Sequence, residues 1–264
     1  LNYLNAVQFV SSQNSEIIKL SYLDEIIQVI KRVLFELCDL DKLDFNASRN
    51  ASDSEKEKLK ENKYYFHERL VKKILQRPLN LKRGNIFTTN YDLAFENAFD
   101  NQGVNYIDGF SGFQNRTFKP ETYDYDIYYP GSTTQGKVSR IEKVIRYYKI
   151  HGSLTWIKTP PSATNIYGIK EVPIELIRRL KDDPLESLIG DIMIYPSATK
   201  KSYTLDFPYS ELFRQFSSTI TQSQSVLFAY GYSFCDEHIN DIIYQALSIP
   251  SFTLIVIDFL GTRN

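Results

Sequence analysis

Polar side chains that could do chemistry follow two of the short apolar runs in this sequence. Thr89, Asn90 and Asp92 come directly after the run at 85–88, and His151 follows a second run. An imidazole titrates near neutral pH and can accept a proton. An amide both donates and accepts hydrogen bonds, so it can orient a water molecule or a sugar hydroxyl. These residue types could therefore support proton transfer at a sugar or at water.

Each of these groups also has a structural explanation. Thr, Asn and Asp at a helix start accept hydrogen bonds from its first unpaired N–H groups, so Asn90 and Asp92 could simply cap a helix. A lone histidine beside a glycine, such as His151, most often satisfies an ordinary hydrogen bond. Considered alone, the stretch 85–99 favours helix capping over a functional site. The rest of the chain is needed to decide between the two.

The elements that would position these groups alternate between helix and strand, most clearly in the second half. Apolar periodicity predicts the elements at these ranges: helices 16–37, 64–76, 93–99, 172–183, 209–223 and 236–247, and strands 85–88, 144–152, 192–198, 225–233 and 252–259. The polar segment 41–62 favours a solvated loop or a frayed helix start. Short apolar strands with helices between them are typical of a parallel sheet buried on both faces.

The predicted fold class is therefore α/β, a Rossmann-like parallel sheet with helices on both faces and a helical, loop-rich insert. We expect one domain over 1–264. Within it, 1–80 is a helical region and 103–137 is a loop-rich insert crowded with aromatic residues. The Tyr side chains of this insert are expected to pack within it.

Polar groups are also predicted where two later strands end. In an open parallel sheet, ligands bind at the carboxyl ends of the strands. Gly231 and Ser233 follow one strand, where backbone N–H groups and a helix N-terminus could hold a phosphate. Asp258 ends the last strand, where a carboxylate can accept hydrogen bonds from ribose hydroxyls. Together with Asn90 and His151, these residues predict a nucleotide cleft.

Composition excludes several other classes of function. The net charge is −1 with no excess of either sign, so no direct nucleic-acid binding is expected. No apolar run is long enough to cross a bilayer, so no membrane binding is expected, and no signal peptide is visible, which indicates the cytoplasm. The two cysteines, Cys38 and Cys235, are too few for a zinc cluster, so no metal is predicted.

Four stretches in a fixed order carry a resemblance to a known family. They read TTNYD, KIHGS, IYPSATKK and LFAYGYSFCDEHIND, and they lie within residues 85–258. In this order they resemble the sirtuin-like domains of bacterial antiphage defence proteins. The stretches DGFSG, IYPSATKK and GYSFCDEHIND are especially similar to the sirtuin-like subunits that assemble with a HerA-type ATPase.

The chain departs from the sirtuin pattern in three respects. The glutamine of the sirtuin elbow is replaced by Thr89, which changes its ribose contact. The zinc-binding cysteines of deacylating sirtuins are absent, and so is the glycine loop that should bind the pyrophosphate. Because the chain also begins at Leu1 without Met, we expect it to be a fragment of a longer protein whose glycine loop precedes it.

The resemblance implies an activity and gives each residue a role. NAD would be the substrate, hydrolysed to nicotinamide and ADP-ribose by an antiphage effector that depletes NAD, and no metal would be needed. Partners would be further copies of the chain, a HerA-type ATPase, or both. As a hypothesis, the residues act as follows: Asn90 positions water, His151 takes a proton, Asp92 holds the nicotinamide amide, Thr89 supports the ribose, and Gly231, Ser233 and Asp258 bind the rest of NAD.

Two alternatives remain open at this point. One is protein deacylation with NAD as co-substrate, which needs an acyl-lysine channel that a zinc module usually frames. The other is a non-catalytic module that senses NAD or ADP-ribose and regulates a partner. The pair Asn90 and His151 argues only weakly against the second alternative.

Overall fold

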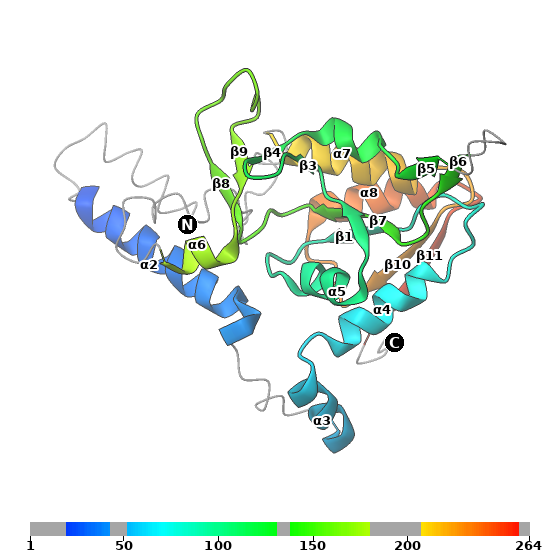
Figure 1. Cartoon of the computed structure of the whole chain (residues 1–264), viewed down its shortest axis with the longest axis horizontal. Coiled ribbons are helices and arrows are strands. Elements are labelled where there is room, and N and C mark those ends of the chain that lie inside the picture. The colour runs from blue at the N-terminus through cyan, green and yellow to red at the C-terminus, as the bar shows by residue number, and fades with distance from the viewer. Residues whose placement is uncertain (1–19, 43–51, 131–137, 180–206, 259–264) are drawn as a thin grey trace. The chain divides into compact units, whose positions relative to one another are not determined.

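The computed structural model describes residues 20–42, 52–130, 138–179 and 207–258 (Figure 1). The chain divides into two compact units, which we call unit 1 (Leu1–Tyr195) and unit 2 (Pro196–Asn264). Each unit has its own set of helices and its own parallel strands. The single domain expected over the whole chain stays a prediction.

Unit 1 begins with helices. They are α2 (Leu20–Cys38), the 3₁₀ turn η1 (Leu40–Lys42), α3 (Asp53–Glu61) and α4 (Tyr65–Leu75). Over the described residues, α2 and α4 confirm the helices predicted from apolar periodicity. Of the loop and the frayed helix start expected within 41–62, the structure has a helix at 53–61, because Lys, Glu and Leu are good helix formers even without a core-facing stripe.

The centre of unit 1 is a three-stranded parallel sheet. Its strands are β1 (Asn85–Thr88), β2 (Asn105–Ile107) and β7 (Val144–Lys149), in the order β1-β7-β2. Both neighbours run parallel to β7. The helix α5 (Ala94–Gln102) connects β1 to β2, so the chain crosses over the central strand. This arrangement confirms the predicted α/β class with a parallel sheet.

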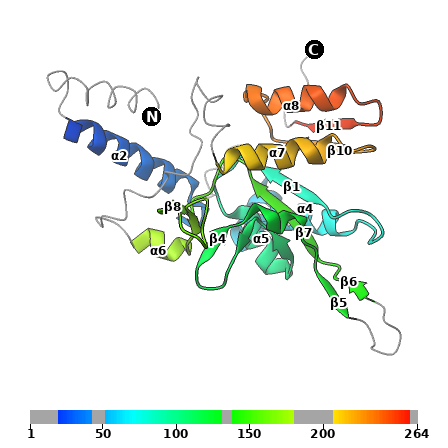
Figure 2. The same cartoon turned by 90° about the horizontal axis from the view of Figure 1, so that it is seen from above.

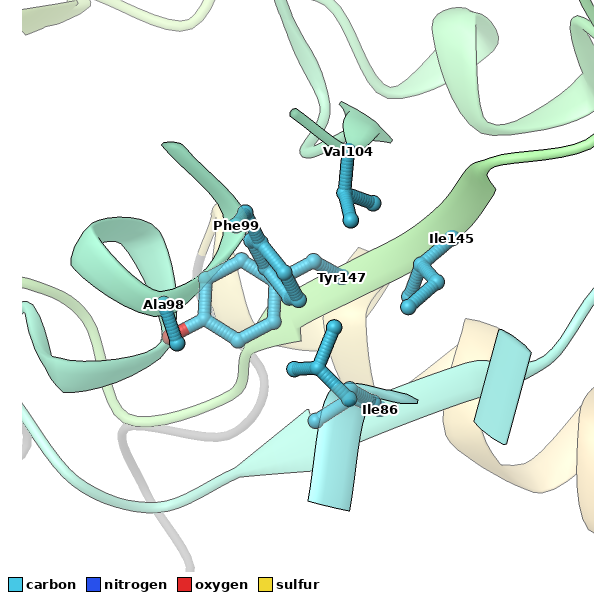
Figure 3. Packing of buried hydrophobic residues seen from close by; sticks show 7 residues of the cluster. Ile86, Ala98, Phe99, Val104, Ile145 and Tyr147 are labelled. Carbon is cyan, nitrogen blue, oxygen red and sulfur yellow. The ribbon is translucent and has the colours of Figure 1, made fainter. Parts of the chain in front are cut away.

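One face of this sheet carries the main core of unit 1, built with α4 and α5 (Figure 3). Side chains alternate between the two faces of a strand, so Ile145 and Tyr147 of β7 enter this core together. The core consists of these buried side chains: Val71, Ile86, Ala98, Phe99, Val104, Ile145 and Tyr147. Tyr148 therefore faces the other side, where its ring stacks on Phe87 at 4.3 Å and on Tyr123 at 4.2 Å.

A second, antiparallel sheet makes up a small module of unit 1, which we call the aromatic module. Its strands, in the order β3-β4-β9-β8, are β3 (Phe110–Ser111), β4 (Arg116–Phe118), β9 (Ile169–Glu171) and β8 (Trp156–Lys158). Phe110 and Phe118 pack on Trp156, with ring centroids 5.0 and 6.1 Å away, and Tyr167 meets Phe118 at 5.7 Å. The insert expected at 103–137 thus supplies β3 and β4, while β2 within that range belongs to the parallel sheet.

Two short helices and a pair of antiparallel strands complete unit 1. They are η3 (Pro120–Asp124), α6 (Ile174–Arg179), β5 (Tyr128–Pro130) and β6 (Val138–Arg140). β5 and β6 pair antiparallel, and Figure 2 shows them projecting away from the parallel sheet. The helix α6 confirms part of the helix predicted at 172–183.

Unit 2 alternates helix and strand as the sequence predicts. Its elements are α7 (Tyr209–Ile220), β10 (Val226–Tyr230), α8 (Glu237–Leu247) and β11 (Thr253–Ile257). β10 and β11 are parallel neighbours, and α7 contacts α8. Both strands were expected to be buried, yet only Ala229 among their side chains is buried in the structure. The strand predicted at 192–198 and the stretch IYPSATKK lie outside the described residues.

Candidate functional site

The loops that follow β1 and β7 are joined by backbone hydrogen bonds. Thr88 and Lys149 end the two strands as register partners. The N–H of Ile150 donates to the carbonyl of Thr88 at 3.0 Å, and the N–H of Leu154 donates to that of Tyr91 at 3.1 Å. We call residues 88–92 the elbow and residues 150–154 the β7 loop. These bonds place the elbow, which carries Asn90 and Asp92, beside the loop that carries His151.

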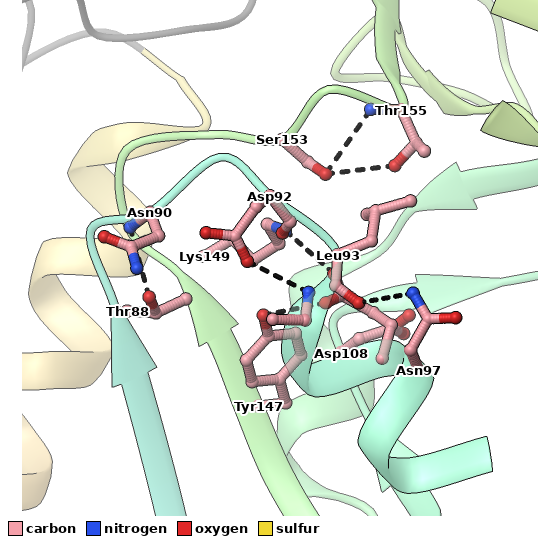
Figure 4. Close-up of polar contacts among 12 residues, drawn as sticks. Thr88, Asn90, Asp92, Leu93, Asn97, Asp108, Tyr147, Lys149, Ser153 and Thr155 are labelled. Atoms are coloured by element: carbon pink, nitrogen blue, oxygen red, sulfur yellow. Dashed lines mark hydrogen bonds and ion pairs between the residues drawn. The ribbon is translucent and has the colours of Figure 1, made fainter. Parts of the chain in front are cut away.

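The elbow is held by its own side chains. Thr88 Oγ1 accepts the backbone N–H of Asn90 at 3.1 Å, and Asp92 Oδ1 accepts the N–H of Ala94 at 2.9 Å (Figure 4). One carboxylate oxygen of Asp92 thus satisfies the first N–H of α5, although the N-cap position itself is Leu93, which has no side-chain cap. Asn90 is exposed and Thr89 is half-buried, so the amide that was predicted to meet a substrate is accessible.

The β7 loop turns inward at a glycine. Gly152 has φ +91°, in the region that favours glycine over residues with a Cβ. On either side of it, His151 is 6% exposed and Ser153 is fully buried. Ser153 Oγ lies 3.0 Å from Thr155 Oγ1. The imidazole predicted to take a proton is thus much less accessible than the amide of Asn90.

A buried ion pair, which the sequence reasoning missed, lies directly beneath the elbow. The Lys149 ammonium, 4% exposed, donates to the backbone carbonyl of Asp92 and to Glu96 Oε1, the latter at 2.8 Å. The Tyr147 hydroxyl donates to Glu96 Oε2 at 3.1 Å. Burial raises the pKa of the Glu96 carboxyl, and the nearby Lys149 charge opposes that rise. The one sequence signal for this ion pair was a lysine at the end of a largely apolar strand.

A small cavity of ≈ 10 Å³ lies next to this pair, which is room for about one water molecule. Glu171 and Trp156 of the aromatic module line it together with Glu96, Lys149 and Asp108, which lies just before β3. The cavity therefore joins the buried ion pair to the aromatic module.

Arg116 of the aromatic module bridges two carboxylates that line this cavity. Its guanidinium pairs with Asp108, and its Nε lies 2.6 Å from Glu171 Oε2. Burial, with the negative charge of Glu171 nearby, raises the pKa of Asp108 well above its usual range, to about 7. The bridge partly offsets this rise because its positive charge favours the ionised carboxylate.

Unit 2 brings together two of the other predicted site residues. Gly231 has φ +60°, and its N–H donates to the carbonyl of Ile257 at 3.4 Å. Gly231 and Asp258 therefore lie at the same edge of the β10–β11 sheet, and Asp258 is exposed. Ser233 is also exposed, in the loop that leads to α8. A single site that contains these residues together with Asn90 and His151 stays a prediction.

Within the described ranges, no group of three or more His, Cys, Asp and Glu side chains could hold a metal ion. No helix in the described part of the chain is both long and apolar enough to cross a bilayer.

Comparison with known families assigns the chain. Residues 84–252, more than half of the sequence, match the SIR2-like domain. The chain belongs to the SIR2-like family. SIR2-like domains use NAD, and members of the family are NAD-dependent enzymes, so this SIR2-like chain is associated with NAD-related activity. The matched range contains Thr89, Asn90, Asp92, His151 and Ser233, while Asp258 follows it. No curated protein matches the sequence significantly.

The side chains at the joined loops fit a nucleotide substrate. The amide of Asn90, the hydroxyl of Thr89 and the carboxylate of Asp92 are the donors and acceptors that ribose hydroxyls and a carboxamide require. They stand at the carboxyl ends of parallel strands, where open α/β sheets bind their ligands. The donor set of the elbow is therefore compatible with the nicotinamide riboside half of NAD.

Proposed function

We propose that this SIR2-like domain hydrolyses NAD to nicotinamide and ADP-ribose. The observation that carries the proposal is the pair of backbone hydrogen bonds joining the elbow to the β7 loop. This pairing gives an exposed amide and an imidazole-bearing loop a common place at the end of two parallel strands. NAD hydrolysis needs a water molecule that is oriented toward the ribose and a group that can receive its proton.

In this proposal each side chain near the elbow has one task. Asn90 orients the attacking water, Asp92 holds the nicotinamide carboxamide, and Thr89 supports the ribose. The oxygen of water forms a bond to the ribose carbon while the bond from that carbon to the nicotinamide nitrogen breaks. His151 receives the proton that water loses and passes it to solvent.

The adenosine half of NAD is assigned to unit 2. Gly231 and Ser233 would face the phosphates with the N–H groups that precede α8, where a helix N-terminus favours negative charge. Asp258 would accept hydrogen bonds from the adenosine ribose. The exposure of Ser233 and Asp258 supports a binding role for both residues.

The low exposure of His151 favours one second candidate. A residue that is 6% exposed must become accessible before it can exchange a proton with a substrate. A module that binds NAD or ADP-ribose without cleaving it would have no such requirement. This sensing module is therefore the alternative that the experiment has to exclude.

The biological setting of the proposal rests on the sequence resemblance. We infer an antiphage effector that depletes NAD in the cytoplasm, acting with further copies of the chain or with a HerA-type ATPase. Destruction of NAD is toxic, so such an assembly would also restrain the activity until it is needed.

The test is an NAD consumption assay on the full-length protein, with and without an acylated-lysine peptide. We expect equal release of nicotinamide and ADP-ribose without the peptide, no acceleration when it is added, and no stoichiometric zinc in the purified protein. Nicotinamide release that strictly requires the peptide would replace hydrolysis with deacylation. NAD binding without cleavage, measured by calorimetry, would replace it with the sensing module.

A further inference from the structure

Lys149 is a buried charged residue at a position of the sheet where an apolar side chain would be expected. It ends the central strand β7, whose other inward residues are aliphatic or aromatic, and its side chain is 4% exposed. A buried ammonium is costly unless it is paired and hydrogen-bonded. Lys149 has two acceptors in the segment that follows β1: the carbonyl of Asp92 in the elbow and the carboxylate of Glu96 in the first turn of α5.

These contacts connect the end of β7 to the elbow and to the start of α5. Tyr147, two residues earlier on the same strand, adds a hydrogen bond to the second oxygen of Glu96. Because Tyr147 and Lys149 both donate hydrogen bonds to Glu96, the start of α5 has a defined position relative to the end of β7. The contact of Lys149 with Asp92 can be followed in Figure 4, where both residues are labelled.

The remaining backbone of the elbow is fixed in the same manner. The carbonyl of Thr88 accepts the N–H of Ile150, and that of Tyr91 accepts the N–H of Leu154. The contact from Lys149 to Asp92 is the one elbow contact among these three that comes from a side chain. It holds Asp92, which follows Asn90 in the chain and lies two residues before α5 begins. The Thr88 contact, by contrast, lies before Asn90.

We propose that Lys149 is a positioning residue of the NAD site: its ammonium, together with Glu96, sets the height and angle of the elbow against the β7 loop. Its effect on the reaction passes through Asn90 and Asp92. This inference rests on the proposed NAD hydrolysis for its kinetic consequence. Its structural consequence, an elbow held at Asp92, does not depend on which reaction occurs.

The experiment compares three variants of the full-length protein. Lys149→Met removes the ammonium but leaves the Glu96 carboxylate buried without its partner, which destabilises the fold. Lys149→Met combined with Glu96→Gln removes both charges at nearly constant volume. Lys143→Met is the matched control, because Lys143 is exposed and stands just before the opposite end of β7. Hydrogen–deuterium exchange over 88–96 and steady-state NAD kinetics are measured for each folded variant.

For the double variant we expect faster exchange confined to 88–96, a kcat reduced by ~10-fold or more, and a KM changed much less, since a misplaced group chiefly affects the transition state. The control should match the wild type in both measurements. If the wild type cleaves NAD and the double variant retains its kcat, the positioning role is wrong. If the wild type cleaves no NAD, the proposed hydrolysis fails, and exchange alone decides: unchanged protection over 88–96 overturns the role of Lys149.

Discussion

Thr88 and Lys149 face each other as register partners at the last position of two neighbouring parallel strands. The chain therefore leaves the sheet at the same level after β1 and after β7. Everything predicted for the nicotinamide half of the site follows one of these two residues within four positions. The first prediction tests the residues that this relationship places together.

Asn90→Ala and His151→Ala should each abolish NAD cleavage while the protein stays folded. Loss of a positioned acid–base group typically costs ~10²–10⁴ in rate. Asn80→Ala is the matched control for the first variant, because Asn80 is also exposed but precedes β1 instead of following it. Near wild-type turnover in either site variant would show that its assigned role is wrong. Circular dichroism checks that each variant is folded.

Asp258→Ala should weaken NAD binding more than it slows the chemical step. The adenosine ribose is remote from the bond that breaks, so its contacts are the same in the ground state and the transition state. Loss of such uniform binding raises KM and leaves kcat largely unchanged. A variant with normal KM and reduced kcat would contradict the assignment of Asp258 to the adenosine end.

Asp108→Asn should flatten the dependence of stability on pH. The folded state raises the pKa of Asp108 from an ordinary 3.8 to about 7, so the folded protein binds a proton that the unfolded chain releases in this range. The contribution of this group is therefore favourable at low pH and is lost as pH rises from about 3.8 to about 7. We expect the free energy of unfolding of the variant, relative to wild type, to rise across that interval.

The control for this measurement is Asp124→Asn, an exposed aspartate in η3. It should leave the pH dependence of unfolding unchanged. Parallel stability curves for Asp108→Asn and the wild type would mean that Asp108 titrates normally in the folded protein.

Phe118→Ala should destabilise the aromatic module by ~3–5 kcal/mol, the usual cost of truncating a buried phenylalanine. Phe118 is 1% exposed and packs on Trp156, which is the one tryptophan of the sequence. Denaturant unfolding followed by Trp fluorescence therefore reports on this module directly. Phe113→Ala is the control, because Phe113 is fully exposed beside β4 and should change neither stability nor emission. Equal stability of the two variants would refute the packing role.

The sequence by itself determined the local elements and the family. The strand 85–88 and the helices at 65–75, 209–220 and 237–247 follow from apolar periodicity, which reflects interactions between near neighbours. The apolar runs also identified Asn90, His151 and Gly231 as residues that follow the end of a strand. Local patterns left 53–61 open between a loop and a frayed helix start, where helix-forming residues make a helix without an apolar stripe.

Only the tertiary structure decided how the site is supported. Lys149 and Glu96 lie 53 residues apart, and Arg116 and Glu171 lie 55 apart, so no periodic pattern connects them. The aromatic module likewise pairs strands that precede β7 in the sequence with strands that follow it. The expectation of a contiguous insert at 103–137 did not include this pairing. Such pairs form because burying a charge or an aromatic ring requires a partner from whichever segment the fold brings near, and sequence distance does not limit that choice.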